Sequence, residues 1–103
     1  MAELDIKNAV EILGALAQEN RLRIFLLLAD SGPEGIPAGI ISASSDLTPS
    51  SVTFHLKELV RTGLVKSRQQ GRFMIYSATT DGISSVLALA LLHKSRLKTG
   101  APR

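Results

Sequence analysis

The hydrophobic period of this chain changes at Gly63, and that change limits the folds it can adopt. Residues 49–62 place their apolar side chains three and four positions apart, which is the spacing of an amphipathic helix. Residues 64–69 and 73–77 instead alternate apolar and polar side chains on either side of Gln70 and Gly71, a pattern typical of a β-hairpin. The chain is therefore predicted to have an α+β fold in which a helix leads directly into two short strands.

Further helices surround this unit. Apolar spacing predicts a helix over 4–16, a nearly apolar and central helix over 19–29, and a short helix over about 37–44 that follows a loop at 34–37. A last helix begins at residue 80 or 81 and runs to about residue 92. The predicted order is thus mainly helical: helix, helix, helix, helix, strand, strand, helix.

The helix at 49–62 has clear start and stop signals. Thr48 is placed to cap it, Pro49 suits its first position, and Gly63 suits a left-handed residue just beyond its end. Together with the short helix before it and the hairpin after it, this helix predicts a winged helix-turn-helix. The chain has 103 residues, and we expect one such domain over 1–97 and a flexible tail over 98–103.

The charge of the chain is divided unevenly along its length. Residues 1–47 contain three basic and seven acidic side chains, whereas residues 48–103 contain nine basic and two acidic ones. The basic half includes the helix at 49–62 and the hairpin. This asymmetry predicts that one side of the protein faces a polyanion, and double-stranded DNA is the polyanion that winged helices bind.

The helix at 49–62 has an outward face opposite its apolar stripe. Exposed Phe54 suits contact with a thymine methyl group in the major groove; alternatively, it packs under a neighbouring loop or at a dimer contact. His55 is expected either to donate to a phosphate or base edge or to pack inside the protein. The apolar stripe consists of Val52, Leu56, Leu59 and Val60, and the outward face of Ser50, Phe54, Lys57 and Arg61, flanked by Thr53 and His55.

Hydroxyl groups crowd the start of this helix, where the helix dipole and free N–H groups favour a phosphate. Capping and solvation are their alternative roles. The hairpin tip at 66–74 has basic and amide groups that suit a minor groove or the DNA backbone; alternatively, it is a solubilising turn that protects an edge strand. The side chains expected to contact DNA are Thr48, Pro49, Ser50, Ser51, Thr53, Phe54, His55, Lys57, Arg61, Arg68, Gln70 and Arg72.

Several stretches of the chain resemble the ArsR/SmtB family of bacterial winged-helix repressors. They are LAQENRLRI at 16–24, TPSSVTFHLKEL at 48–59, GLV at 63–65 and RQQGRFMIY at 68–76. The motifs stand in the family's order, and the resemblance extends over about residues 9–92. It implies a homodimer that is built on the first and last helices, binds an imperfect inverted repeat in double-stranded DNA and represses transcription.

The last helix favours a dimer independently, because apolar residues lie on nearly every side of it and one small core cannot cover them all. A chain this short also builds a core of limited stability, which favours association with a second copy. The side chains expected at the interface are Leu4, Ile6, Val10, Ile83, Val86, Leu87, Ala90 and Leu91.

Members of the family commonly respond to metal ions or arsenic(III), and this chain departs from their ligand patterns. It contains no cysteine, and Pro37 and Gly39 stand where many members have a Cys-x-Cys pair. The last helix offers only Asp81 and His93, too few ligands for zinc or nickel. We expect no metal site and no cofactor, and the effector is unknown. A metal site without cysteine and an apolar small molecule between the dimer helices are the alternatives.

Other classes of function fit less well. The chain has no glycine-rich phosphate loop and no His-Glu-x-x-His motif, so we expect no enzyme. A winged helix that docks on another protein through Phe54 is a further alternative, and binding that weakens with salt would argue against it. The charged N-terminal stretch is unlike a signal peptide and no apolar segment is long enough to span a bilayer, so we expect no membrane contact and a cytoplasmic protein.

Overall fold

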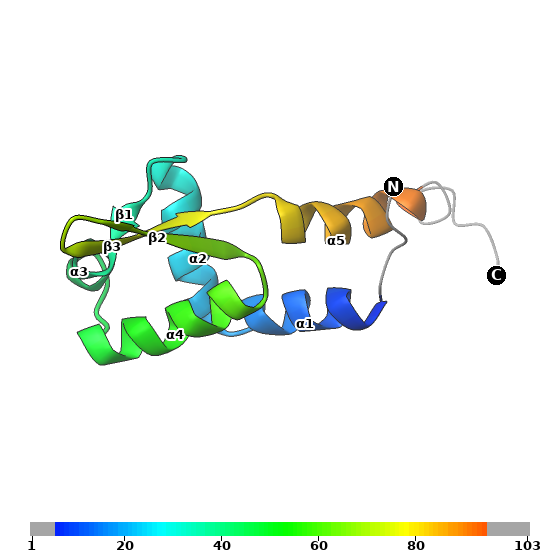
Figure 1. Ribbon diagram of the computed structural model, residues 1–103. Helices are drawn as coiled ribbons and strands as arrows, with labels where there is room; N and C mark the ends of the chain where they lie inside the picture. The colour runs from blue at the N-terminus through cyan, green and yellow to red at the C-terminus, as the bar shows by residue number, and fades with distance from the viewer. Residues whose placement is uncertain (1–5, 95–103) are drawn as a thin grey trace.

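The structure is a computed structural model that describes residues 6–94. Leu4 and the tail expected at 98–103 lie outside the described residues. The fold is the predicted winged helix-turn-helix, mainly helical with one small antiparallel sheet (Figure 1). Its elements are α1 (Ile6–Leu16), α2 (Glu19–Ser31), β1 (Ile36–Pro37), α3 (Ala38–Ala43), α4 (Pro49–Arg61), β2 (Val65–Gln70), β3 (Phe73–Ala78) and α5 (Asp81–Leu92).

Strand β1 corrects the sequence analysis, which assigned residues 34–37 to a loop. It pairs antiparallel with β3, Ile36 opposite Tyr76 and Pro37 opposite Ile75, so the strand order is β1-β3-β2. A strand of two residues has no period to detect, and only its distant partner defines it. Pro37 belongs to this edge strand and to the N-cap position of α3, so α3 begins at Ala38 and not at residue 37 as predicted.

Gly35 allows β1 to reach β3. Its φ is +74°, and a Cβ atom at this position would overlap the backbone carbonyl oxygen of Tyr76. Glycine alone combines a positive φ with so close an approach of two backbones. The turn before β1 therefore depends on this residue.

The remaining elements agree with their predicted ranges to within two residues. Helix α2 continues to Ser31, whose Oγ donates to the carbonyl oxygen of Leu27 at 2.8 Å. The hairpin strands extend to Gln70 and Ala78, with Val65 opposite Ala78 and Gln70 opposite Phe73. These shifts lie at element ends, where fraying and capping decide the last residue.

The core lies where α2, α3 and α4 meet the sheet. Helix α2 is its central helix, as predicted, but it buries only one side, because Leu22 and Leu26 are exposed. Phe25 is buried too, and the largest apolar side chains that are fully buried are Ile12, Ile24, Leu28, Ile41, Leu56, Leu59 and Leu64.

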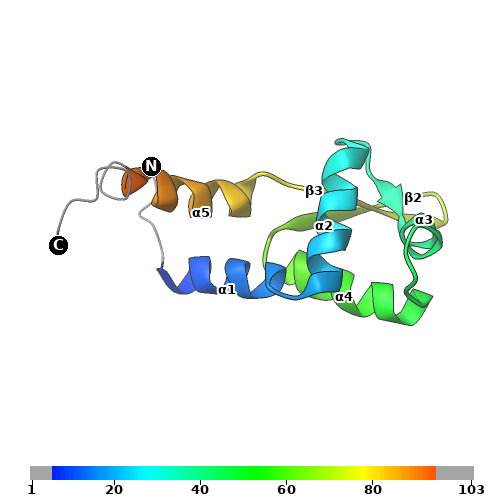
Figure 2. The ribbon, with the colours of Figure 1, turned by 180° about the vertical axis from the view of Figure 1, so that it is seen from behind.

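Helices α1 and α5 lie side by side and project together from the winged-helix body (Figures 1 and 2). Helix α1 buries Ala9, Ile12 and Ala15, whereas α5 contains no buried residue. No helix within residues 6–94 is both long enough and apolar enough to cross a membrane. We call the pair α1 and α5 the helical arm.

Candidate nucleic-acid interface

Local interactions define both ends of α4. The Oγ1 atom of Thr48 accepts a hydrogen bond from the backbone N–H of Ser51 at 3.2 Å, which confirms the predicted cap, and Pro49 occupies the first position. At the other end, Gly63 adopts φ +79°, and the N–H of Leu64 donates to the carbonyl oxygen of Leu59 at 3.0 Å. The helix is thereby held at two fixed points.

The predicted two faces of α4 are present. Val52, Leu56 and Leu59 are buried in the core, while Phe54 and Lys57 are exposed on the opposite side. Val60 differs from the prediction, since it lies at the edge of the stripe and is partly exposed. Within the described residues Phe54 is 65% exposed and does not pack under a loop, which leaves the DNA, docking and dimer-contact roles for it.

His55 was predicted to flank the DNA face, and the structure corrects this. The side chain is buried, so packing inside the protein is its role. Within residues 6–94 its Nδ1 atom has no hydrogen-bond partner. Burial lowers the pKa of His55, and the charge of Arg21 lowers it further, so the neutral imidazole is favoured.

Among the hydroxyl groups at the start of α4, that of Thr48 has the capping role considered for them. Thr48 caps the helix, and its Oγ1 lies 3.3 Å from Oγ of Ser50. The Oγ1 of Thr53 donates to the carbonyl oxygen of Pro49 at 3.0 Å. Thr48, Ser50 and Thr53 are exposed and Ser51 is half-buried. Exposed oxygens and the positive end of the helix dipole therefore share one surface.

The hairpin β2–β3 uses part of its polar surface internally. Arg68 donates from Nη1 to the backbone carbonyl oxygen of Glu34 at 3.0 Å and from Nη2 to Oε1 of Gln70 at 2.9 Å. The bond to Glu34 connects the hairpin to the turn before β1, and the bond to Gln70 stays within β2. Arg72, at the tip, has no ion pair with any residue of the described part of the chain.

Two apolar side chains beside the tip were missed by the sequence analysis. Phe73 and Met74 are both exposed at the start of β3. Because successive residues of a strand point to opposite faces, two adjacent apolar residues next to a turn cannot both face the core. This pair of adjacent apolar residues beside the turn was the sequence signal that could have identified an exposed apolar surface. The hairpin tip therefore combines a cation with apolar surface.

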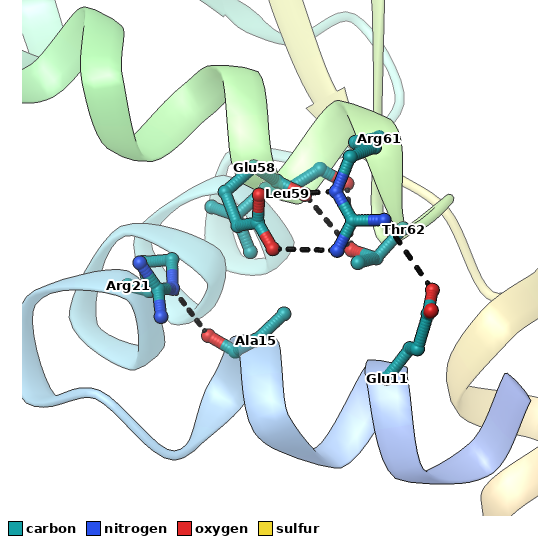
Figure 3. A network of polar contacts seen from close by, with 7 residues as sticks. All are labelled: Glu11, Ala15, Arg21, Glu58, Leu59, Arg61 and Thr62. Atoms are coloured by element: carbon teal, nitrogen blue, oxygen red, sulfur yellow. Dashed lines mark hydrogen bonds and ion pairs between the residues drawn. The ribbon is translucent and has the colours of Figure 1, made fainter. Parts of the chain in front are cut away.

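Arg61 is exposed on α4, as predicted, but its charge is paired within the protein. Its guanidinium donates to the carboxylates of Glu58 on α4 and Glu11 on α1 (Figure 3). The hydrogen bond from Arg61 lowers the pKa of Glu58, which keeps that carboxylate ionised. The charge of Arg61 is thus already paired, because the long side chain bends toward the helical arm.

The helical arm exposes an apolar surface. Val86 and Ile83, expected at the interface, are half-buried against the core of the same chain, because they lie on the inner side of α5. Ala90 is exposed. Leu13 and Leu92 were not predicted for this surface. Its exposed large side chains are Ile6, Val10, Leu13, Leu87, Leu91 and Leu92.

Metal ligands do not gather in the described residues. Among residues 6–94, no three His, Cys, Asp or Glu side chains lie close enough together to hold a metal ion. Asp81 begins α5 and His93 follows its end, so the helix itself separates these two candidate ligands.

Comparison with known proteins gives matches in sequence and in fold. Residues 16–68 match a family model described as a helix-turn-helix domain. The transcriptional activator HlyU of Vibrio cholerae is 30% identical over 92 residues, which are 89% of this chain and 81% of that protein. A putative arsenical resistance operon repressor, ArsR of Halobacterium salinarum, is 32% identical over 80 residues, which are 78% of this chain and 61% of that protein.

A solved structure matches in fold. It is the solution structure of a homodimeric winged helix-turn-helix DNA-binding domain from Mycobacterium bovis, described as a possible ArsR-family transcriptional regulator. It superposes with a TM-score of 0.68 at 20% identity and covers 95% of this chain and 88% of that one. At this identity the match shows the fold alone.

Proposed function

This chain belongs to the ArsR/SmtB-type winged helix-turn-helix transcription regulators, and from this premise we propose that it binds double-stranded DNA as a homodimer. In the proposed complex α4 lies in the major groove, and the hairpin β2–β3 contacts the adjacent backbone or minor groove. Such a regulator acts in the cytoplasm and has no catalytic role.

The exposed face of α4 is the observation that carries this proposal. Phe54 and Lys57 project from a helix whose other side is fixed in the core and whose ends are both capped. A rigid helix with an outward ring and cation suits a base edge and a phosphate: Phe54 contacts a thymine methyl group, and Lys57 a phosphate. Ser50, Ser51 and Thr53 approach the backbone at the start of the helix.

The hairpin extends this surface. Arg72 contacts a phosphate or enters the minor groove, and Phe73 adds apolar contact beside it. Arg68, which also bonds to Gln70, holds the hairpin in place for this contact through its bond to the carbonyl oxygen of Glu34.

The apolar surface of the helical arm supports the homodimer. Large exposed side chains on two adjacent helices form an apolar patch that a soluble monomer rarely leaves uncovered. A second copy provides a matching patch through two-fold symmetry, and a two-fold dimer reads an inverted repeat. The homodimeric solved structure is consistent with this assembly.

We propose repression as the regulatory outcome. A dimer bound over a promoter excludes the polymerase without needing any contact with it. One relative is described as an activator and another as a putative repressor, so the direction requires its own test. A reporter gene behind the selected DNA site is expected to be less active when the protein is present. Increased activity of the reporter gene would show that the protein activates transcription.

The decisive experiment is selection of bound DNA from a random pool. We expect an imperfect inverted repeat, bound by a dimer, with affinity that falls steeply as salt rises. Failure to enrich any sequence would contradict the proposal. Docking on a protein through Phe54 is the second candidate, and salt-insensitive capture of a protein instead of DNA would favour it. The selected fragment then serves to screen metals and small apolar molecules as effectors.

A further inference from the structure

A side-chain bridge connects the last turn of α4 to α1, which lies 50 residues earlier in the chain. Arg61 donates from Nη1 to Oε1 of Glu11 at 3.3 Å. Its Nε and Nη2 atoms donate to the two carboxylate oxygens of Glu58 at 3.1 and 2.7 Å (Figure 3). One guanidinium group thus holds two carboxylates, one on its own helix and one on the helical arm.

This pairing makes Arg61 a poor phosphate ligand. Because the guanidinium already donates to two carboxylates, its charge is compensated within the protein and less of it is available to a phosphate. Lys57, on the same helix, forms no ion pair among residues 6–94 and keeps its charge for a phosphate. The two cations that the sequence placed on one face therefore differ in their ion pairing within residues 6–94.

Helix α1 has a second polar attachment near its end. The Nε atom of Arg21 on α2 donates to the backbone carbonyl oxygen of Ala15 at 2.7 Å (Figure 3). Arg21 thereby satisfies a carbonyl that has no partner within the last turn of α1. Helix α1 also packs Ala9, Ile12 and Ala15 against the rest of the protein, and the Arg61–Glu11 bridge adds a direct polar connection from this helix to α4.

We propose that Arg61 is a positioning residue whose bridge to Glu11 fixes the angle between α4 and the helical arm, and so sets the half-site spacing that the dimer accepts. This inference rests on the proposed function, because it requires a dimer formed through the arm. Two recognition helices reach successive major grooves only when they lie about 34 Å apart. Any pivot of α4 against α1 occurs in both subunits and changes that separation.

The test measures spacing preference directly. Operators taken from the selection experiment are rebuilt with the half-sites one or two base pairs closer or farther apart. The wild-type protein is expected to bind one spacing most tightly. In Glu11→Gln or Arg61→Gln, the ratio between the affinities for the preferred and the altered spacing is expected to fall about two- to fivefold, which is the range for exposed ion pairs. The double variant is expected to lose no more than either single one, because all three break the same bridge.

A matched control comes from α2. Glu19 and Arg23 form an exposed ion pair at 2.6 Å within that one helix, so Glu19→Gln removes the same chemistry without loosening the arm. It is expected to leave the spacing preference unchanged. The side chains of Arg61 and Glu11 are 56% and 51% exposed, so neither replacement disturbs the core. Glu11→Gln and Arg61→Gln break the bridge from opposite ends. An effect that both variants share is therefore due to the loss of the bridge and not to a defect of one variant.

Salt dependence distinguishes positioning from phosphate contact. Lys57→Gln is expected to lower the slope of log affinity against log salt by about one per subunit, and Arg61→Gln to leave it unchanged. An equal fall of the salt slope in Arg61→Gln would make Arg61 a phosphate ligand and overturn the inference. An unchanged spacing preference in both Glu11→Gln and Arg61→Gln would also overturn it. If the wild-type protein selects no repeat or stays monomeric, the proposed function itself fails.

Discussion

The ring of Phe54 meets the ring of His55 edge to face, with centroids 5.4 Å apart and ring planes at 70°. These neighbours on α4 nevertheless lie in different environments, since His55 is 6% exposed and Phe54 65%. The buried imidazole therefore provides a fixed neighbour on one side of the exposed Phe54 ring.

Replacing Phe54 with Ala is expected to reduce discrimination between the selected operator and random DNA by about tenfold, because a base contact is lost. Stability should change by less than about 0.5 kcal/mol, since the side chain is exposed. Competition binding measures the ratio of the two affinities. Leu26→Ala, at an exposed apolar position on α2, is the matched control. A Phe54→Ala protein with full operator preference would rule out the base contact.

Leu91→Asp is expected to separate the dimer into monomers. The charge would be buried against an apolar partner surface, which costs several kcal/mol of association free energy, roughly the desolvation of one unpaired ion. Sedimentation velocity across a range of concentrations measures the change. Leu26→Asp, which adds the same charge away from the helical arm, should leave the assembly intact. A dimer that persists in Leu91→Asp would place the interface elsewhere.

Arg72→Ala is expected to weaken binding to all DNA sequences alike and to lower the salt slope by about one per subunit, because a phosphate contact is lost. Fluorescence anisotropy at several salt concentrations provides the slope. Arg23→Ala removes a cation already paired with Glu19 on α2 and should not change it. The hairpin would have no role on DNA if the Arg72→Ala slope equalled that of the wild type.

Acid should destabilise the protein through His55. Its folded-state pKa lies below the ordinary value of 6.5, so below pH 6.5 the unfolded chain binds more protons than the folded one. The free energy of unfolding therefore falls as pH drops from 6.5 toward the folded-state pKa, by about 1.4 kcal/mol per unit of difference between the two pKa values. Urea unfolding at several pH values across this window measures the loss.

His55→Leu is the companion variant to that titration. It removes the titrating group, and the buried Nδ1 atom has no bond to lose within residues 6–94. The variant should show a flatter dependence of unfolding free energy on pH just below 6.5. An identical pH dependence in both proteins would assign the effect to other groups.

Gly35→Ala is expected to cost more stability than Gly63→Ala, although both residues have a positive φ. At Gly63 the new Cβ meets no atom within 4 Å, so only the strain of a left-handed backbone, about 1–2 kcal/mol, applies. At Gly35 the same strain is joined by overlap with the carbonyl oxygen of Tyr76, which disturbs β1 and its pairing. Thermal unfolding compares the two variants, and equal losses would show that the turn adapts.

The sequence alone predicted the winged helix-turn-helix order and the recognition helix, because those signals are local. Thr48, Pro49 and Gly63 act on the nearest turn of backbone, and the apolar period of 49–62 needs no knowledge of distant residues. The exposure of Phe54 follows from the same period. These features depend on interactions between residues a few positions apart, which any fold containing the helix preserves.

Tertiary structure alone decided the features that join distant segments. Strand β1 exists because β3 pairs with it, His55 is buried because other elements close over the flank of α4, and Arg61 turns to Glu11 across 50 residues. Helical periodicity gives the direction in which a side chain leaves its own helix, but it does not give the residues of other elements that the side chain meets. Which neighbour covers, bonds or neutralises that side chain depends on how the elements pack, and this is why the charge assigned to the DNA face is in fact paired with the helical arm.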